Sequence, residues 1–350
     1  MKTSFARLND LLDHGFDTVI DVRSPAEFEQ DHVPGAINLP ALSDAERAEV
    51  GTIYVQVAPF HARKVGAALV ARNVAAHLEG PLRDKDGGWR PLVYCWRGGQ
   101  RSGSFASILT QIGWRAEVID GGYQSFRTLV HDTLYKHALP HRLTLLDGNT
   151  GTAKTDILHR LDQLGVQVID LEGLANHRGS LLGEMEGGQP TQKAFETALA
   201  CALARLDPAR PIILEAESSK VGERIIPPAL WTAMKAAPRI QINAPIAARA
   251  TYLAQAYGDV SINRDRLTAK LEVLRRHRGG LVDGWLTLLN DGAFEGLARA
   301  LMEDHYDPTY RSGRARNGAE VLETFVVTSL TQADRADLAQ RIADWVTEAS

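Results

Sequence analysis

The chain has 350 residues, of which 44% are hydrophobic and 23% charged, and this length exceeds what one hydrophobic core usually serves. We therefore expect an ordinary soluble protein with two domains. The net charge of −4 gives no sign of a nucleic-acid surface over the whole molecule, and two distant cysteines, Cys95 and Cys201, exclude a disulfide framework and a sulfur-ligated metal.

The N-terminal residues 1–17 are interrupted by charges and contain no continuous apolar stretch. They therefore predict neither a signal peptide nor a membrane span. Because two unpaired cysteines also suit a reducing compartment, we expect a cytoplasmic protein without a membrane partner.

The following segments alternate predicted strands with predicted helices. Apolar runs predict strands at 18–22, 92–94 and 116–120, and helices are expected from near Ala26 and through 65–72. Strands and helices in this alternation predict an α/β domain in which helices cover both faces of a parallel sheet.

Cys95 follows the second of these strands and opens a loop rich in glycine and arginine. Gly98 and Gly99 permit the backbone to curl so that several N–H groups face the sulfur, which would stabilise a thiolate. Arg97 and Arg101 flank the cysteine and would position an anionic donor.

Ser102 is the expected cap of the next helix, so a helix N-terminus and the two arginines should together lower the pKa of the Cys95 thiol. We predict that Cys95 is an exposed, reactive thiolate and that Arg97 and Arg101 take part in its chemistry. The alternative is a buried structural cysteine, the commoner fate of a free cysteine.

Three stretches resemble a rhodanese domain: DVRSPAEFEQDHVPGAINLP at 21–40, CWRGGQRS at 95–102 and VIDGGY at 118–123. In that family the loop cysteine carries sulfur or selenium as a persulfide or perselenide, so the resemblance makes Cys95 the carrier. Asp21 and Arg23 are expected to brace the loop, and the alternative is an ordinary ion pair at a strand end.

A domain boundary is expected near residues 124–141. It divides the chain into a rhodanese-like domain at 1–135 and a P-loop-containing α/β domain with a mostly helical C-terminal part at 136–350.

Directly after this boundary, a predicted strand at 143–147 leads into a Gly-rich turn and a helix. The turn contains Gly148, Asn149, Thr150, Gly151, Thr152, Ala153, Lys154 and Thr155. This is nearly a P-loop, in which backbone N–H groups bind phosphates while Lys154 and Thr155 supply a cation and a magnesium-binding hydroxyl. Ala153 stands where the pattern has glycine, and is tolerated if its φ is negative. The alternative is a Gly-rich turn without a ligand.

Carboxylates end the other predicted strands of this domain. The strand at 211–215 ends in Glu215 and is followed by Glu217, an arrangement typical of magnesium sites in P-loop proteins, with Glu215 the better candidate. Asp170 and Glu172 follow another predicted strand, at the sheet edge where ligands bind, and are expected to support the site. The alternative is a solvated strand terminus.

The remainder is mostly helical, with helices predicted at 191–206, 246–257, 266–278 and 334–347. Cys201 lies on the first of these among alanines and leucines, so we expect it in the core. Basic residues collect in two places and are candidates for binding RNA phosphates, although a solvated face is equally compatible with them. These residues are Arg275, Arg276, Arg278, Arg311 and Arg314.

A rhodanese domain fused to a domain carrying GNTGTAKT, DLEGLANHRGSLLG and ILEAESSKVGERIIP resembles the tRNA 2-selenouridine synthases over almost the entire chain. The resemblance implies that geranyl diphosphate alkylates the sulfur of wobble 2-thiouridine in tRNA. Selenium from selenophosphate then displaces the S-geranyl group.

The residues suit both steps. Lys154, Thr155 and a magnesium ion held by Glu215 would neutralise the leaving diphosphate, and Cys95 would hold selenium as a perselenide. Two other interpretations stay open: a sulfurtransferase using thiosulfate with a P-loop ATPase, and a nucleotide-regulated RNA-binding adaptor without catalysis.

Overall fold

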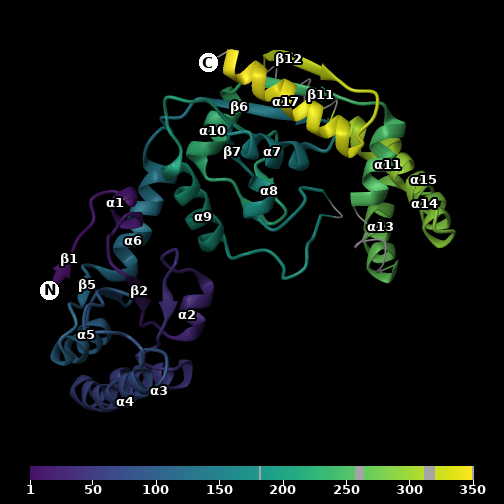
Figure 1. Ribbon diagram of the computed structural model, residues 1–350. Coiled ribbons are helices and arrows are strands. Elements are labelled where there is room, and N and C mark those ends of the chain that lie inside the picture. The colour runs from purple at the N-terminus through teal and green to yellow at the C-terminus, as the bar shows by residue number, and fades with distance from the viewer. Residues whose placement is uncertain (181–182, 257–263, 311–319, 349–350) are drawn as a thin grey trace. The chain divides into compact units, whose positions relative to one another are not determined.

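The computed structural model describes residues 1–180, 183–256, 264–310 and 320–348. Contacts within it separate two units (Figure 1). The first comprises Met1–His137 and Pro190–Arg205, and the second comprises Ala138–Gln189 and Leu206–Ser350. Within the described ranges, none of the helices combines the length and the hydropathy that crossing a bilayer demands.

The first unit contains a sheet of five parallel strands in the order β1-β5-β4-β2-β3. These strands are β1 (Lys2–Thr3), β5 (Glu117–Ile119), β4 (Pro91–Tyr94), β2 (Thr18–Asp21) and β3 (Ile37–Asn38). The middle strand, β4, is buried along its whole length, which explains its unbroken apolar sequence. Cys95 therefore follows the most enclosed strand of the sheet.

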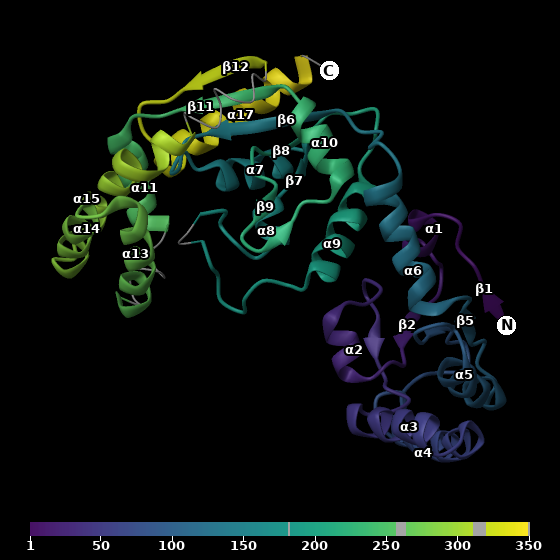
Figure 2. The ribbon, with the colours of Figure 1, turned by 180° about the vertical axis from the view of Figure 1, so that it is seen from behind.

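Helices cover both sides of this sheet, as predicted. Helices α3 (Asp44–Gln56), α4 (Pro59–Glu79) and α5 (Gln100–Ile112) pack together on one side, and α1 (Leu8–Leu12) and α6 (Gly122–His131) lie on the other (Figures 1 and 2). The short α2 (Pro25–Gln30) follows β2, and a π-helical turn, η1 (Asp132–Lys136), continues α6.

Helix α9 (Gln192–Arg205) belongs to this first unit by its contacts, although it lies far along the chain. A buried polar network explains the assignment. Arg127 of α6 forms an ion pair of 2.6 Å with Glu196 and donates to the Thr197 hydroxyl at 3.0 Å. The buried Asp31 carboxylate accepts from Thr197 at 3.0 Å and from Tyr123 at 2.7 Å. The prediction placed one boundary after residue 135, so it did not include the return of residues 190–205 to the first unit.

The second unit contains another sheet of five parallel strands, in the order β12-β11-β6-β8-β7. Its strands are β12 (Val321–Val326), β11 (Arg239–Asn243), β6 (Leu143–Gly148), β8 (Ile212–Glu215) and β7 (Gln167–Ile169). From β6 the chain first builds β7 and β8 on one side of that strand and later builds β11 and β12 on its other side. Such a switch point, at the carboxyl ends of parallel strands, is where α/β proteins bind ligands.

The helices around this second sheet include α7 (Lys154–Gln163) and α17 (Gln332–Glu348), which contact each other. Their apolar side chains share one buried core with β6 and β11, including Leu146, Ile157 and Leu338. The short helices α8 (Leu171–Leu174) and α10 (Pro228–Ala236) and a two-stranded antiparallel pair, β9 (Lys220–Val221) and β10 (Arg224–Ile225), complete this part.

A separate helical group follows β11, with its own small core around Trp285. It consists of α11 (Ile246–Ala256), α13 (Arg264–Arg278), α14 (Leu281–Asn290), α15 (Phe294–Leu301) and the π-helical η2 (Met302–Tyr306). Figures 1 and 2 show these helices gathered beside one end of the second sheet. The helices predicted at 246–257, 266–278 and 334–347 correspond to α11, α13 and α17, and residue 257 lies outside the described residues.

Candidate functional site

The Cys95 sulfur lies at the centre of a turn between β4 and α5. It accepts hydrogen bonds from the Gly99 N–H at 3.3 Å and from the Ser102 hydroxyl at 3.2 Å. Burial by itself would raise the pKa of the thiol, but hydrogen bonds from the Ser102 hydroxyl and from the backbone N–H groups of Ser102, Arg97 and Gly99 lower it below its ordinary value. Backbone N–H groups and one hydroxyl thus converge on the Cys95 sulfur, which is the geometry that the glycines of the loop predicted.

Two glycines allow this turn to close on the following segment. Gly98 has a φ of +63° and Gly122 has a φ of +59°, and a β-carbon on Gly122 would clash with the Cys95 carbonyl oxygen. The close approach lets the Tyr123 N–H donate to that carbonyl at 2.8 Å. Gly99 has open space around it, so its conformation does not demand glycine in the same way.

The expected exposure of Cys95 is wrong, and the role of Arg97 and Arg101 in positioning an anionic donor stays a prediction. Cys95 is only 4% exposed, because the turn folds over it. The Arg97 guanidinium donates to Gln124 at 3.0 Å, and Arg101 forms an ion pair of 2.8 Å with Glu27. The backbone amides and one hydroxyl, rather than the two arginines, are thus the groups that contact the sulfur.

Ser102 is also not the helix cap. Helix α5 begins at Gln100 with Gly99 as its N-cap, so Ser102 lies within the first turn. From there its hydroxyl donates directly to the Cys95 sulfur, whereas a capping serine would bond the backbone of the helix.

Asp21 and Arg23 form a buried ion pair of 2.6 Å at the end of β2. The Arg23 guanidinium also stacks on the Tyr123 ring, 3.8 Å from its centre, and Tyr123 in turn holds the Cys95 carbonyl. The sequence left two interpretations open, an ion pair at a strand end and a brace of the cysteine loop. The contacts of this pair are compatible with both.

Replacing Ser102 by alanine is expected to raise the pKa of Cys95 by about one unit, since a hydrogen bond to a charged acceptor contributes about 1.5 kcal/mol. The pH profile of alkylation by iodoacetamide, in a Cys201→Ser background, measures this shift towards higher pH. Ser104→Ala on the exposed side of the same helix is the control and should leave the midpoint in place. An unshifted midpoint in Ser102→Ala would show that the backbone alone stabilises the thiolate.

The second site is a cavity of about 340 Å³ at the N-terminus of α7. Gly148 and Asn149 begin the Gly-rich turn, and the residues from Thr150 to Thr155 line the cavity. The Lys154 ammonium donates to the Gly148 carbonyl at 2.9 Å. Burial alone would lower the pKa of Lys154, but the surrounding groups, Tyr310 and Glu172 first among them, raise it, so a cation stays at the Gly-rich turn, where it could meet a phosphate.

Ala153 has a φ of +59°, so the condition under which an alanine would be tolerated here without strain, a negative φ, is not met. The chain must enter the left-handed region here to turn from the loop into α7, of which Ala153 is the N-cap. Its methyl group packs into the buried core of the second unit, which offsets part of the conformational cost.

Replacing Ala153 by glycine is therefore expected to change the free energy of unfolding by less than about 0.5 kcal/mol, because relieved strain and lost methyl burial nearly cancel. The same change at the exposed Ala336 of α17 should lower it by about 1 kcal/mol. Urea titrations of the two variants measure the contrast, and equal losses would show that Ala153 carries no backbone strain.

The carboxylates are arranged differently from the prediction. Glu215 is fully buried, and its carboxylate accepts from the Leu171 N–H at 3.0 Å. Burial, with the neighbouring Asp170 and Glu172, raises the pKa of Glu215 well above its usual range. Glu215 therefore holds the start of α8 through one carboxylate oxygen, and its role as a magnesium ligand stays a prediction.

Glu172 takes the place that was expected for Glu215. It lines the cavity and accepts from the Thr155 hydroxyl at 2.9 Å. Burial and the neighbouring Glu217 raise its pKa, and the two carboxylates approach the same glycine, Gly179. Asp170, also predicted, lines the cavity and bonds His159 at 2.7 Å.

A magnesium ion would fit the Thr155 hydroxyl and the Glu172 carboxylate, which are oxygen donors of the kind that this ion prefers beside phosphates. Across the described residues, no group of three or more His, Cys, Asp or Glu side chains forms a metal cluster. Such a site would thus resemble the usual magnesium sites, in which substrate phosphates and water complete the coordination.

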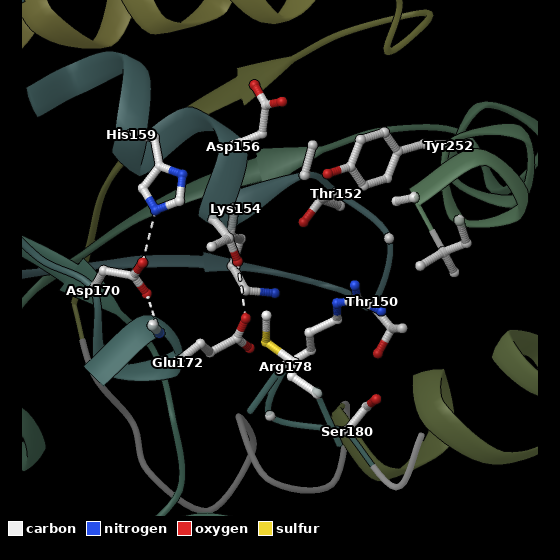
Figure 3. Close-up of a pocket in the computed structure, with 18 of the residues that line it drawn as sticks. Thr150, Thr152, Lys154, Asp156, His159, Asp170, Glu172, Arg178, Ser180 and Tyr252 are labelled. Carbon is white, nitrogen blue, oxygen red and sulfur yellow. Dashed lines mark hydrogen bonds and ion pairs between the residues drawn. The ribbon is translucent and has the colours of Figure 1, made fainter. Parts of the chain in front are cut away.

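One wall of this cavity was not predicted from the sequence. Tyr252, Leu253 and Ala256 of α11 line it, together with Tyr310 and Met185. Their apolar spacing predicts a helix with a buried face, but not which surface that face meets. Figure 3 shows Tyr252 on one side of Lys154, with His159, Asp170 and Glu172 on the other.

Among the basic candidates for RNA, Arg275 forms ion pairs with Glu272 and Asp283, at 2.6 and 2.8 Å. Arg278 donates to His305 at 3.2 Å, and Arg276 is exposed. Arg311 and Arg314 lie outside the described residues. A role for these side chains in binding RNA stays a prediction.

Comparisons with known proteins cover both units. The family described as "Rhodanese-like domain" matches residues 4–129, and the family described as "tRNA 2-selenouridine synthase AAA domain" matches residues 141–277. A protein of Hahella chejuensis named tRNA 2-selenouridine synthase is 32% identical over 330 residues, covering 83% of this chain and 84% of that protein. A protein of the same name from Pseudomonas syringae pv. syringae is 31% identical, covering 87% and 90%.

A third protein with this name, from Nitrosomonas europaea, is 35% identical over 243 residues. This match covers 68% of the present chain but only 63% of the relative, so the chain spans less than two thirds of that relative's length.

Proposed function

Because this chain belongs to the tRNA 2-selenouridine synthase family, we propose that it replaces the sulfur of wobble 2-thiouridine in tRNA with selenium, in the cytoplasm. The observation that carries the proposal is the presence, in one chain, of a stabilised thiolate at Cys95 and a cationic phosphate-binding turn at Lys154. The replacement of sulfur by selenium would then take place in two steps, the first at the Gly-rich turn and the second at Cys95.

In the first step, geranyl diphosphate binds at the N-terminus of α7. The thiouridine sulfur attacks the first carbon of the geranyl group, the carbon–oxygen bond breaks, and diphosphate leaves. Lys154 and the start of α7 stabilise the negative charge that develops on the leaving group. A magnesium ion bound at Thr155 and Glu172 would supply further charge neutralisation.

In the second step, the Cys95 thiolate attacks the selenium of selenophosphate, the Se–P bond breaks with its electron pair on phosphorus, and Cys95 holds the selenium atom as a perselenide. The terminal selenium attacks C2 of the S-geranylated base, the C2–S bond breaks and geranyl thiol leaves. A small thiol added with selenophosphate then cleaves the S–Se bond, which releases 2-selenouridine and leaves Cys95 in a disulfide with that thiol. The hydrogen bonds that stabilise the Cys95 thiolate would likewise stabilise a terminal anion on that sulfur. This role follows the resemblance of the loop to rhodanese domains.

Mass spectrometry of a defined reaction tests the proposal. The full chain is incubated with tRNA that carries wobble 2-thiouridine, first with geranyl diphosphate and then with selenophosphate. We expect S-geranyl-2-thiouridine after the first addition and 2-selenouridine after the second. An unmodified tRNA, accompanied by rapid thiosulfate:cyanide turnover and ATP hydrolysis, would instead support a sulfurtransferase with a P-loop ATPase.

A further inference from the structure

One face of α11 is fixed against the phosphate-binding turn. Arg249, Tyr252, Leu253 and Ala256 are spaced three and four residues apart, so they share this face. The buried Arg249 donates to the Thr150 carbonyl at 3.1 Å and forms an ion pair of 2.7 Å with Asp307. The turn, α11 and the residues that follow η2 are thus tied together by one guanidinium.

The apolar part of the face begins directly at the turn. A β-carbon added to Gly151 would lie 2.9 Å from the side chain of Leu253, so Leu253 already contacts the loop that binds phosphate. Ala256 lies three residues further along the helix, a rise of about 4.5 Å along the helix axis. Both residues line the cavity, together with Tyr310 and Met185.

The opposite wall has a different chemistry. It presents Asp170 and Glu172, and the ion pair of Asp170 with His159 lies there (Figure 3). A hydrocarbon placed against these carboxylates would remove their hydration without replacing it, whereas the α11 face offers it apolar contacts. A ligand with a diphosphate at one end and a hydrocarbon at the other therefore has one favourable orientation in the cavity.

We propose that this face of α11 binds the hydrocarbon chain of the diphosphate donor and that Ala256 sets how long a chain the cavity accepts. The inference rests on the proposed function and adds to it the residues that select the donor. Leu253 contacts the first part of the chain, next to the diphosphate. The small methyl group of Ala256 leaves room for the part beyond it.

A series of donors tests the inference: dimethylallyl, geranyl and farnesyl diphosphate, with five, ten and fifteen carbons. Ala256→Phe fills the far part of the cavity. We expect it to lower kcat/KM for geranyl transfer by about 10- to 100-fold while the dimethylallyl donor changes by less than about 3-fold, as steric discrimination in an apolar pocket allows. Ala247→Phe, at an exposed position of the same helix, is the matched control and should leave the ratio unchanged.

A second variant changes the cavity in the other direction, so that the test does not depend on one large side chain folding well. Ala256→Gly enlarges the far part of the apolar space and should raise the farnesyl to geranyl ratio of kcat/KM by about 3-fold. Inhibition by inorganic diphosphate should be the same in wild type and Ala256→Phe, because the phosphate end is untouched.

If wild type transfers geranyl groups but neither variant changes the donor ratios, the inference is overturned while the proposed function stands. Equal losses for all donors in Ala256→Phe, with a weakened inhibition by diphosphate, would also overturn it. If wild type transfers none of the three groups, the proposed function itself fails and the inference fails with it.

Discussion

Replacing Cys95 by serine is expected to abolish selenium incorporation while S-geranylated tRNA continues to form and accumulates. Serine cannot hold selenium as a perselenide, and its hydroxyl is a much weaker acid than the Cys95 thiol, whose pKa is lowered by its hydrogen bonds. The first step uses the other unit and should proceed. Mass spectrometry of nucleosides from tRNA treated with both donors measures the two products separately.

Cys201→Ser is the matched control for this experiment. Burial raises the pKa of Cys201 to about 11, so this second thiol is protonated at neutral pH and should not contribute to the chemistry. The control is expected to make 2-selenouridine at the wild-type rate. Continued selenation by Cys95→Ser, or its loss in both variants, would contradict the role proposed for Cys95.

Replacing Lys154 by alanine is expected to lower the rate of geranyl transfer by about 100- to 1,000-fold, the usual effect of removing one group that stabilises developing negative charge. Lys154 is the cation at the Gly-rich turn and would neutralise part of the charge of a diphosphate bound there. Single-turnover assays with saturating geranyl diphosphate measure the chemical step apart from binding.

Lys235→Ala removes a lysine of the same charge from the exposed surface of α10, and should leave geranyl transfer unchanged. Since Lys154 also bonds the Gly148 carbonyl, circular dichroism and thermal unfolding of Lys154→Ala establish that the turn and α7 still fold. A folded Lys154→Ala protein with the wild-type rate would remove the Gly-rich turn from the reaction.

Local sequence was sufficient to predict features that depend on neighbours in the chain. The strand before Cys95, the glycines after it and the turn from Gly148 to Thr155 all appear where they were expected, because backbone conformation at such turns is set by a few adjacent residues. Local sequence did not decide between a buried structural cysteine and a stabilised thiolate, because the structure combines features of both. Cys95 is buried, and yet its pKa is lowered by donors within seven residues of it.

Prediction failed where a side chain chooses among partners that are distant in the chain. Arg101 pairs with Glu27, and Glu215 is enclosed beneath α8, leaving Glu172 beside Thr155. Sequence spacing could not rank Glu172 above Glu215, since both follow strands whose ends meet at the same edge of the sheet.

The sequence by itself thus determined the two α/β units, the turn that encloses the Cys95 sulfur and the Gly-rich turn before α7, since each depends on periodic burial or on the conformations open to a few consecutive residues. Only the tertiary structure decided that α9 joins the first unit and that α11 forms a wall of the cavity. An amphipathic helix records in its sequence that one face is buried, but the surface that buries it is chosen by the packing of the whole unit.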